Sequence, residues 1–266
     1  MSLNGAPGPL LRVVSAVFWL LLGTAAFAQE PCPVQSRDAQ LHVAHVQDGD
    51  TVRSRSGEWI RLIGIDAPEL GRDGAPDEPF AAEATETLRE LIDQSDGRVV
   101  VQEGREPRDR HGRMLGHLFS TEGRNLQRVL LERGLVMQVF VGENQAFADC
   151  LQPFEEAARQ AGRGIWSLPA YQPGLKSTDI PPETRGAVIV HGRVVRVGHS
   201  RHNVWINLAG RVALKVPRRH AEGFGALDAL EGREVRARGW LVPDRNRYQD
   251  WRMTLTNPRA LEVLDD

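Results

Sequence analysis

The fold of the first half of this chain is decided by the stretch Arg61-Leu62-Ile63-Gly64-Ile65-Asp66-Ala67-Pro68-Glu69 and by two shorter segments around it. The first of these is Asp48-Gly49-Asp50-Thr51, a hairpin-turn signal between two alternating stretches. The second is Asp109-Arg110-His111-Gly112-Arg113, which lies between the strand-like stretches 98–102 and 114–119. This succession of short strands and turns predicts a small β-barrel.

Helical spacing of apolar residues predicts three helices around these strands. The first spans 80–92 and carries on one side Ala81, Ala84, Leu88 and Leu91. The second spans 125–133 and is ended by Gly134, and the third spans 146–161. The fold class expected from the whole chain is therefore mainly β with α.

Carboxylates and arginines in these segments form a set suited to phosphate chemistry. Asp50 and Asp66 can bind a hard cation such as Ca²⁺, with a backbone carbonyl near Ala67 as a third ligand. Glu69 can take a proton from water or orient it. The two arginines Arg61 and Arg113 suit bidentate contacts with one phosphate.

Each segment by itself has a plainer interpretation. A lone Asp-Gly is most often a simple turn, and Asp66-Ala67-Pro68-Glu69 can be a strand end with solvated acids. Arg61 and Asp66 are five residues apart, so on one straight strand they point to opposite faces. Either the strand bends or ends near Asp66, or Arg61 approaches from a neighbouring edge; the spacing leaves both open.

The first 28 residues have the organisation of a secretory signal peptide. Arg12 precedes the apolar run 13–23, and Ala26-Phe27-Ala28 predicts cleavage before Gln29. The alternative is an uncleaved anchor, but the run is shorter than the ~20 apolar residues that a spanning helix needs. The expected location is the periplasm or the outside of the cell, without stable membrane insertion of the mature chain.

Cys32 and Cys150 are the two cysteines of the chain. In an oxidising compartment an even pair favours one disulfide, although two free thiols remain the alternative.

A second unit follows the first. We expect a first domain at 39–168, a Pro-rich linker at 169–185 and a second barrel at 186–266, with five strand-like stretches and a helical stretch at 219–230. Residues 39–168 contain 15 Lys and Arg against 22 Asp and Glu, whereas 186–266 contain 14 against 9. The second unit is therefore the better binder of a polyanion by charge alone.

Residues 41–166 resemble the thermonuclease family, whose domain is like staphylococcal nuclease. The resemblance rests on the three segments above together with Leu131-Glu132-Arg133-Gly134-Leu135 and Gly162-Arg163-Gly164-Ile165-Trp166. It implies a five-stranded OB barrel with three helices that uses Ca²⁺ to hydrolyse DNA and RNA phosphodiesters. It also implies that Asp50, Asp66 and the Ala67 carbonyl hold the metal, that Arg61 and Arg113 clamp the phosphate, and that Glu69 acts on water.

Three positions depart from the family pattern. Ala67 stands where Thr is common, His111 where Tyr is common, and Phe140 near a position of paired tyrosines. His111 and Phe140 are therefore candidate substrate contacts.

The second unit is similar to an OB-fold nucleic-acid-binding module, in which aromatics interleaved with arginines bind single strands. We expect Trp205 and Trp240 in its core, and Tyr248 and Trp251 as contacts.

The sequence thus predicts an exported, Ca²⁺-dependent nuclease acting on DNA, RNA or both, with single strands preferred. The sequence leaves two alternatives: a nucleic-acid-binding protein without turnover, and an envelope protein that uses both barrels for protein contacts.

Overall fold

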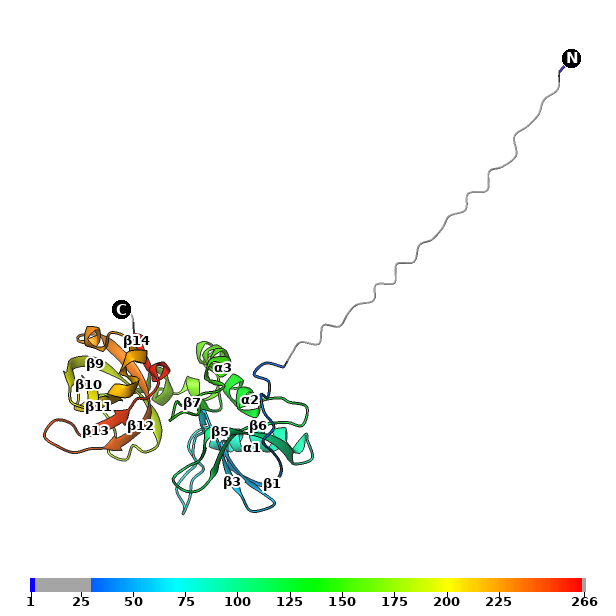
Figure 1. Cartoon of the computed structure of the whole chain (residues 1–266), viewed down its shortest axis with the longest axis horizontal. Coiled ribbons are helices and arrows are strands. Elements are labelled where there is room, and N and C mark those ends of the chain that lie inside the picture. Colours follow the sequence, from blue (N-terminus) through cyan, green and yellow to red (C-terminus); the bar gives the residue numbers. More distant parts are fainter. Residues whose placement is uncertain (3–29, 265–266) are drawn as a thin grey trace.

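The computed structural model describes residues 1–2 and 30–264, so residues 3–28 of the predicted signal peptide lie outside the described part. Figure 1 shows two β-rich bodies side by side, the first coloured blue to green and the second yellow to red. No helix within the described residues is long and apolar enough to cross a membrane.

Five strands close the first barrel, in the order β1-β2-β3-β6-β5. Neighbouring strands are antiparallel except for the parallel pair of β3 with β6. The bounds are β1 (Ala39–Asp48), β2 (Thr51–Ser54), β3 (Trp59–Leu62), β5 (Arg98–Arg108) and β6 (Met114–Phe119). A separate pair joins β4 (Ile65–Asp66) to β7 (Met137–Gln138). The predicted fold class, a barrel with helices, is confirmed.

The three predicted helices are α1 (Ala81–Asp93), α2 (Leu126–Glu132) and α3 (Ala148–Gln160). The N-cap of α2 is Asn125, whose side chain accepts a hydrogen bond from the Arg128 backbone N–H at 3.0 Å. After α2 the chain turns at Gly134, which has φ +71°. A side chain there would meet the Arg163 carbonyl oxygen at 2.4 Å, so glycine is required both by conformation and by space.

A second ring of five strands repeats the order and directions of the first. Its strands are β9 (Ala187–His199), β10 (Asn203–Leu208), β11 (Val212–Pro217), β12 (Glu234–Pro243) and β13 (Trp251–Thr254). The parallel pair is β11 with β13, and β12 pairs with β9 to close the ring. Two short strands, β8 (Leu175–Lys176) and β14 (Leu261–Leu264), extend the sheet.

The helix expected at 219–230 is broken into short turns, so that prediction was wrong. The chain forms α4 (Arg218–Ala221) followed by 3₁₀ turns at Glu222–Phe224 and Leu227–Leu230. Gly223 weakens the helix, and Gly225 ends it because its φ is +69°.

The segment 169–185, expected as a linker, is packed against the second barrel. It contains a π turn at Ala170–Gly174, after the 3₁₀ turn Gly164–Ser167 that ends the first unit, and then β8, which pairs in parallel with β9. The Ser177 N–H donates to the His191 carbonyl at 2.8 Å, and Ser177 is buried. The segment has no apolar period, but the edge of β9 pairs with it, and single side chains such as Leu175 and Ile180 pack against the core of the second barrel.

A buried ion pair joins the two barrels. Arg238 of β12 lies 2.7 Å from Glu155 of α3, and both side chains are less than a tenth exposed. Arg238 also lies 3.3 Å from Glu262, which binds Arg159 of α3 at 3.1 Å. Burial favours the neutral guanidine, but Glu155 and Glu262 outweigh it and raise the pKa of Arg238.

Apolar side chains reinforce this joint. Ile189 of β9 packs in one buried cluster with residues of the first unit, namely Met137, Val139, Ala158, Ile165 and Trp166. The joint therefore combines a satisfied charge pair with a small core, which holds the barrels in one arrangement.

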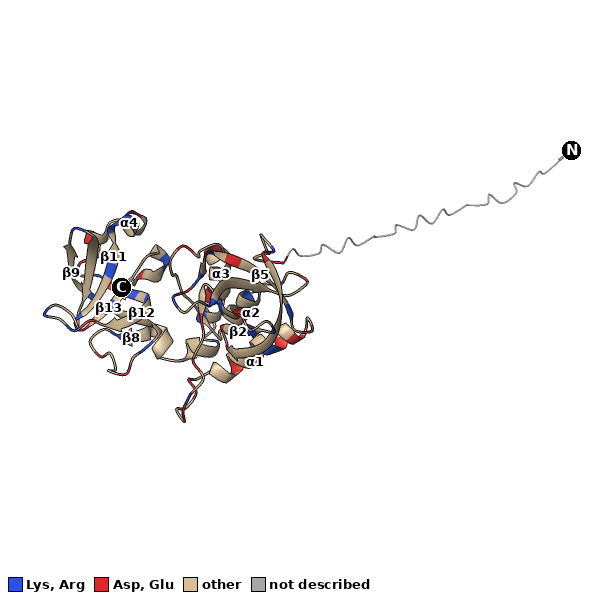
Figure 2. Cartoon of the chain, turned by 60° about the horizontal axis from the view of Figure 1, so that its bottom comes forward, with Lys and Arg blue, Asp and Glu red and all other residues tan. Residues whose placement is uncertain are grey.

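Charge is divided between the two bodies as the sequence predicts. Figure 2 shows acidic residues along α1 and basic residues on β11 and β12.

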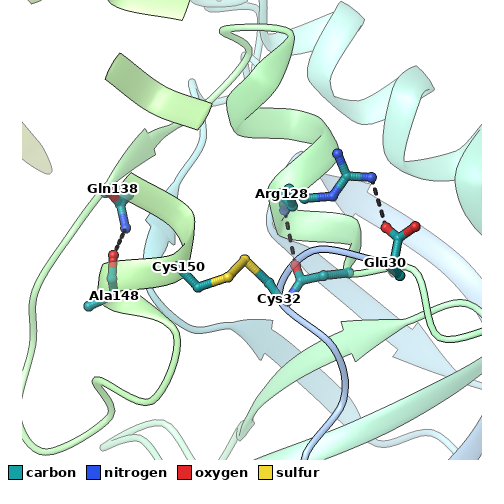
Figure 3. The surroundings of a disulfide bond; sticks show 7 residues. Glu30, Cys32, Arg128, Gln138, Ala148 and Cys150 are labelled. Atoms are coloured by element: carbon teal, nitrogen blue, oxygen red, sulfur yellow. Dashed lines mark hydrogen bonds and ion pairs between the residues drawn. A yellow bond between two sulfur atoms is a disulfide. The ribbon is translucent and has the colours of Figure 1, made fainter. Parts of the chain in front are cut away.

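Cys32 and Cys150 form a disulfide with a Cα–Cα distance of 5.6 Å (Figure 3). Beside it, Glu30 accepts a hydrogen bond from Arg128 of α2 at 2.9 Å. These contacts fasten the segment before β1 to α2 and α3, and the bond spans 118 residues of sequence.

We expect the double substitution Cys32→Ser with Cys150→Ser to lower the free energy of unfolding by roughly 2–5 kcal/mol, because a long loop is released in the unfolded chain. Urea unfolding of both proteins measures the difference. Dithiothreitol should reproduce the loss in the wild-type protein and leave the double variant unchanged. Equal stabilities would contradict a stabilising role for the bond.

We expect Arg238→Met to cost about 3–5 kcal/mol, because it leaves the Glu155 carboxylate buried without its cation. Arg105→Met is the matched control, since Arg105 lies 3.6 Å from Glu143 in a pair that is mostly exposed. That change should cost at most about 1 kcal/mol. If urea unfolding shows similar losses of unfolding free energy in the two variants, the buried pair stabilises the protein no more than the exposed pair does.

Candidate active site

A cleft of about 600 Å³ lies where the two barrels meet. The first barrel contributes acidic and basic side chains to it, and the second barrel and the connecting segment contribute the opposite wall. The first wall holds every residue for which a metal, phosphate or water role was predicted: Asp50, Arg61, Asp66, Ala67, Glu69 and Arg113.

The turn between β1 and β2 positions Asp50. The Asp50 N–H donates to the Asp48 carboxylate at 3.1 Å, and both residues are buried. A side chain at Gly49 would meet the Cβ atoms of Ala84 and Ala67 at 2.7 and 2.8 Å. Glycine therefore lets α1 pack directly on the turn that carries Asp50.

Ala67, Thr51 and Arg61 hold the Asp50 carboxylate. Its Oδ2 accepts from the Ala67 N–H at 2.7 Å, and its Oδ1 accepts from the Thr51 hydroxyl at 2.9 Å. The guanidinium of Arg61 also contacts Oδ1. These contacts fix the orientation of a buried charge that would otherwise be costly.

Arg61 contacts both aspartates. One guanidinium nitrogen pairs with Asp50, and the other lies 2.5 Å from Asp66 Oδ1. Strand β3 ends at Leu62, and the chain turns at Gly64, whose φ is +81°, before β4 begins. Of the two geometries that the spacing left open, the structure has the strand ending before Asp66, so that Asp66 returns toward Arg61.

Burial raises the pKa values of several acids that line the cleft. Burial raises the pKa of Asp66 to about 6; Arg61 opposes this and Glu69 adds to it. Burial also raises the pKa of Asp48, against the attraction of Arg61. The pKa of Glu69 is raised by burial and then by the charge of Asp48. These three acids therefore hold their protons more tightly than exposed carboxyl groups do.

Glu69 lies on the rim, at the start of the loop before α1. Its backbone N–H donates to the Glu78 carboxylate at 2.9 Å, and the Glu78 N–H donates back to the Glu69 carbonyl at 3.0 Å. The Glu69 side chain reaches solvent although neighbouring atoms partly bury its carboxyl group, and Glu78 lines the same cleft. These two hydrogen bonds hold the start of the loop, so that the Glu69 carboxylate is accessible and lies near Asp66.

Arg113 is held by its own loop. Its Nε donates to Asp109 Oδ2 at 2.7 Å, and Asp109 also accepts the backbone N–H groups of His111 and Arg113. Burial favours the neutral form of Asp109, but the hydrogen bonds from Arg113 outweigh it and lower the pKa. Within residues 30–264 the guanidinium of Arg113 makes no other hydrogen bond, and Arg113 lines the cleft.

The donor chemistry of the cleft fits a hard divalent cation. Asp50 and Asp66 offer carboxylate oxygens, which Ca²⁺ prefers, and added positive charge would stabilise both acids. Within residues 30–264 no group of three or more His, Cys, Asp or Glu side chains is placed to hold a metal by itself. Such an ion would need further oxygens, from a carbonyl, water or a phosphate.

The other predicted contacts lie away from the cleft. His111 is exposed and contacts Arg110, and Phe140 packs against the core of the second barrel. Tyr248 is exposed but lines a different hollow. Trp251 is buried in the second core, because β13 pairs with β11 and turns it inward, so the expected exposed contact was wrong there.

Several arginines expected to bind nucleic acid are already paired with acids. Besides Arg238, the pairs are Arg211 with Asp250, Arg236 with Glu262, and Arg252 with Asp244. Acidic residues of the second unit therefore neutralise part of its positive charge.

Sequence reasoning missed the second wall of the cleft, which includes Tyr171, Arg185 and Trp240. Trp240 was expected in the core but is 40% exposed. The alternation of β12 contains this information. Leu241 points into the core, so its neighbour Trp240 points to the opposite face, which also carries Arg238. The pKa of Tyr171 is raised by burial and by the nearby charges of Glu78 and Asp66.

Known proteins resemble the first unit. The profile of the family described as staphylococcal nuclease homologue matches residues 59–168. An uncharacterized endonuclease of Escherichia coli O157:H7 is 32% identical over 138 residues, which cover 51% of this chain and 82% of that protein. The thermonuclease of Staphylococcus intermedius is 28% identical over 161 residues, covering 59% of this chain and 92% of that protein.

The name of a third relative does not mention a nuclease. The succinoglycan biosynthesis protein ExoI of Rhizobium meliloti (strain 1021) is 31% identical over 161 residues, covering 58% of this chain and 75% of that protein. Profile, identity and coverage together lead to one conclusion: this chain belongs to the family of staphylococcal nuclease homologues.

Proposed function

We propose that this protein is an exported nuclease that hydrolyses phosphodiester bonds of DNA, RNA or both with the help of Ca²⁺. Membership of the staphylococcal nuclease homologues places the chain among nuclease enzymes. The observation that carries the proposal is the meeting of two aspartates, a rim glutamate and two arginines in one cleft open to a large substrate.

In this proposal Glu69 acts on the attacking water. Its side chain is accessible at the rim, and its raised pKa makes it a better base than an ordinary carboxylate. It receives the proton of water as the water oxygen bonds to phosphorus and the bond from phosphorus to the leaving ester oxygen breaks; that oxygen takes a proton from solvent water.

Arg61 and Arg113 bind the phosphate that is cleaved. Both line the cleft, and each is oriented by an aspartate. Their guanidinium groups neutralise the charge that grows on the phosphate oxygens in the transition state.

Asp50, Asp66 and the Ala67 carbonyl would hold the cation. Ca²⁺ bound there would supply positive charge that stabilises the phosphate during attack. Arg61 already contacts both aspartates, so it keeps their carboxylates close together and turned toward one point.

Export agrees with the disulfide between Cys32 and Cys150, because such bonds persist in oxidising compartments. The signal peptide predicted at 1–28 would direct the chain there.

We expect Glu69→Gln to lower kcat about 100- to 10,000-fold, because the base is lost while the side-chain volume is kept. Arg113→Ala should lower kcat/KM about 100-fold or more, because transition-state charge is no longer neutralised. Both rates are measured on single-stranded DNA with Ca²⁺, using residues 29–266.

Two controls are available in an ion pair outside the cleft, in which Arg108 lies 2.7 Å from Glu58. Arg108→Ala and Glu58→Gln should leave turnover near the wild-type level. Near-wild-type turnover of Glu69→Gln would remove the assignment of the base. A wild-type protein that binds DNA but never cuts it would favour the alternative of a binding protein.

We expect Asp66→Asn to weaken Ca²⁺ binding at least 10-fold, because a carboxylate ligand becomes neutral. Titration calorimetry measures this directly, without any turnover. Activity of the wild-type protein should stop in EDTA and return with Ca²⁺. If Asp66→Asn binds Ca²⁺ as tightly as the wild type, the ion lies elsewhere.

A further inference from the structure

The wall of the cleft opposite the acids belongs to the second barrel and the segment before it. It is formed by the beginning of β9, by the connecting segment and by Trp240 of β12. No residue of this wall belongs to the part of the chain that matches the family profile, apart from Leu168. The second unit therefore completes the cleft instead of lying apart from it.

Trp240 is suited to contact a ligand. Among the Phe, Tyr and Trp side chains of residues 30–264, only Trp240 and Tyr248 are exposed. An exposed indole offers a flat apolar face, on which a nucleic-acid base can stack.

Trp240 also marks where the cleft continues. A second hollow of about 170 Å³ is lined by Trp240 together with Arg61, Arg113 and Val141. The two hollows share Arg61, Arg113 and Trp240. A strand whose phosphate lies on the two arginines would thus run past the indole on its way along the groove.

Arg185 adds a positive charge on the same wall. It is exposed, and its guanidinium contacts only the carbonyl oxygens of Pro182 and Thr184, at 3.1 and 2.7 Å. Within the described residues no carboxylate lies at ion-pair distance from it, in contrast to Arg236 and Arg238. In a cleft rich in acids, an unpaired arginine favours an anionic ligand such as a backbone phosphate.

The joint between the barrels fixes this wall relative to the acids. Arg238, two residues before Trp240 on the same face of β12, pairs with Glu155 of α3. Ile189, which lines the cleft, packs against the first unit. Stacking on Trp240 would therefore require little ordering of the protein.

We propose that Trp240 and Arg185 bind the nucleotides next to the cleaved phosphate, and that they select a single strand. The proposal rests on the nuclease function proposed above. Trp240 stacks with an unpaired base, which a duplex does not offer, and Arg185 contacts a neighbouring phosphate.

Binding is tested apart from cleavage in the Glu69→Gln background, with Ca²⁺ and a fluorescently labelled single-stranded 12-mer, by anisotropy. Adding Trp240→Leu should weaken binding about 10-fold or more, because the stacking face is lost. Adding Trp240→Phe should keep most of the affinity, which separates stacking from packing. Adding Arg185→Ala should reduce the salt dependence, by about 0.7 in the slope of log K against log salt.

Tyr248→Ala is the matched control, because Tyr248 is an exposed aromatic of the same barrel that lines another hollow. It should bind as the parent does. Unchanged affinity of Trp240→Leu, or a loss confined to Tyr248→Ala, would overturn the proposal. An equal loss for a duplex of the same length would overturn the selection of a single strand.

Kinetics in the otherwise wild-type protein separate this proposal from the nuclease function. Trp240→Leu should lower kcat/KM on single-stranded DNA about 10-fold and leave methyl p-nitrophenyl phosphate unaffected, because that ester has no neighbouring nucleotide. Equal losses on both substrates would contradict a binding role. If the wild-type protein cuts neither substrate, the nuclease function fails, and the anisotropy comparison still decides the role of Trp240.

Discussion

The cleft depends on one guanidinium group placed between a buried carboxylate and a partly buried one. Arg61 contacts Asp50 at the β1–β2 turn and Asp66 in β4, and burial without this cation would be costly for both acids. A second tie, from the Ala67 N–H to Asp50, holds the same two segments together. Because α1 packs directly on Gly49, the turn is also fixed to the helical layer. The positions of the acids thus follow from charge compensation and close packing together.

Strand β12 of the second barrel carries three residues, close together in sequence, that each make a different kind of contact. In β12, Leu241 enters the core of its own barrel, Arg238 crosses to Glu155 of α3, and Trp240 reaches the cleft. The joint with the first unit is both charged and apolar, so it has directional contacts as well as a small core. The acids and arginines of the first barrel therefore face, across the cleft, a wall that includes Trp240 of the second.

Local patterns predicted much of this arrangement. Period-two alternation located the strands of both barrels, and apolar spacing with Gly134 located the three helices of the first. The residues of the first wall were found because short motifs place them at turns and strand ends. Local patterns failed where distant contacts decide: the segment 169–185 is held by β9, and Trp251 is drawn into the core by its pairing with β11.

The sequence by itself determined the two strand-rich units, the helices of the first, and the identity of the acids and arginines, because these depend on neighbours a few residues away. The tertiary structure alone decided that Asp66 turns back to Arg61, and that Trp240 and Arg185 face the acids across one cleft. Those placements depend on a left-handed turn at Gly64 and on contacts between residues far apart in the chain, such as Arg238 with Glu155. No periodic pattern records such contacts, since they arise only when the two barrels pack.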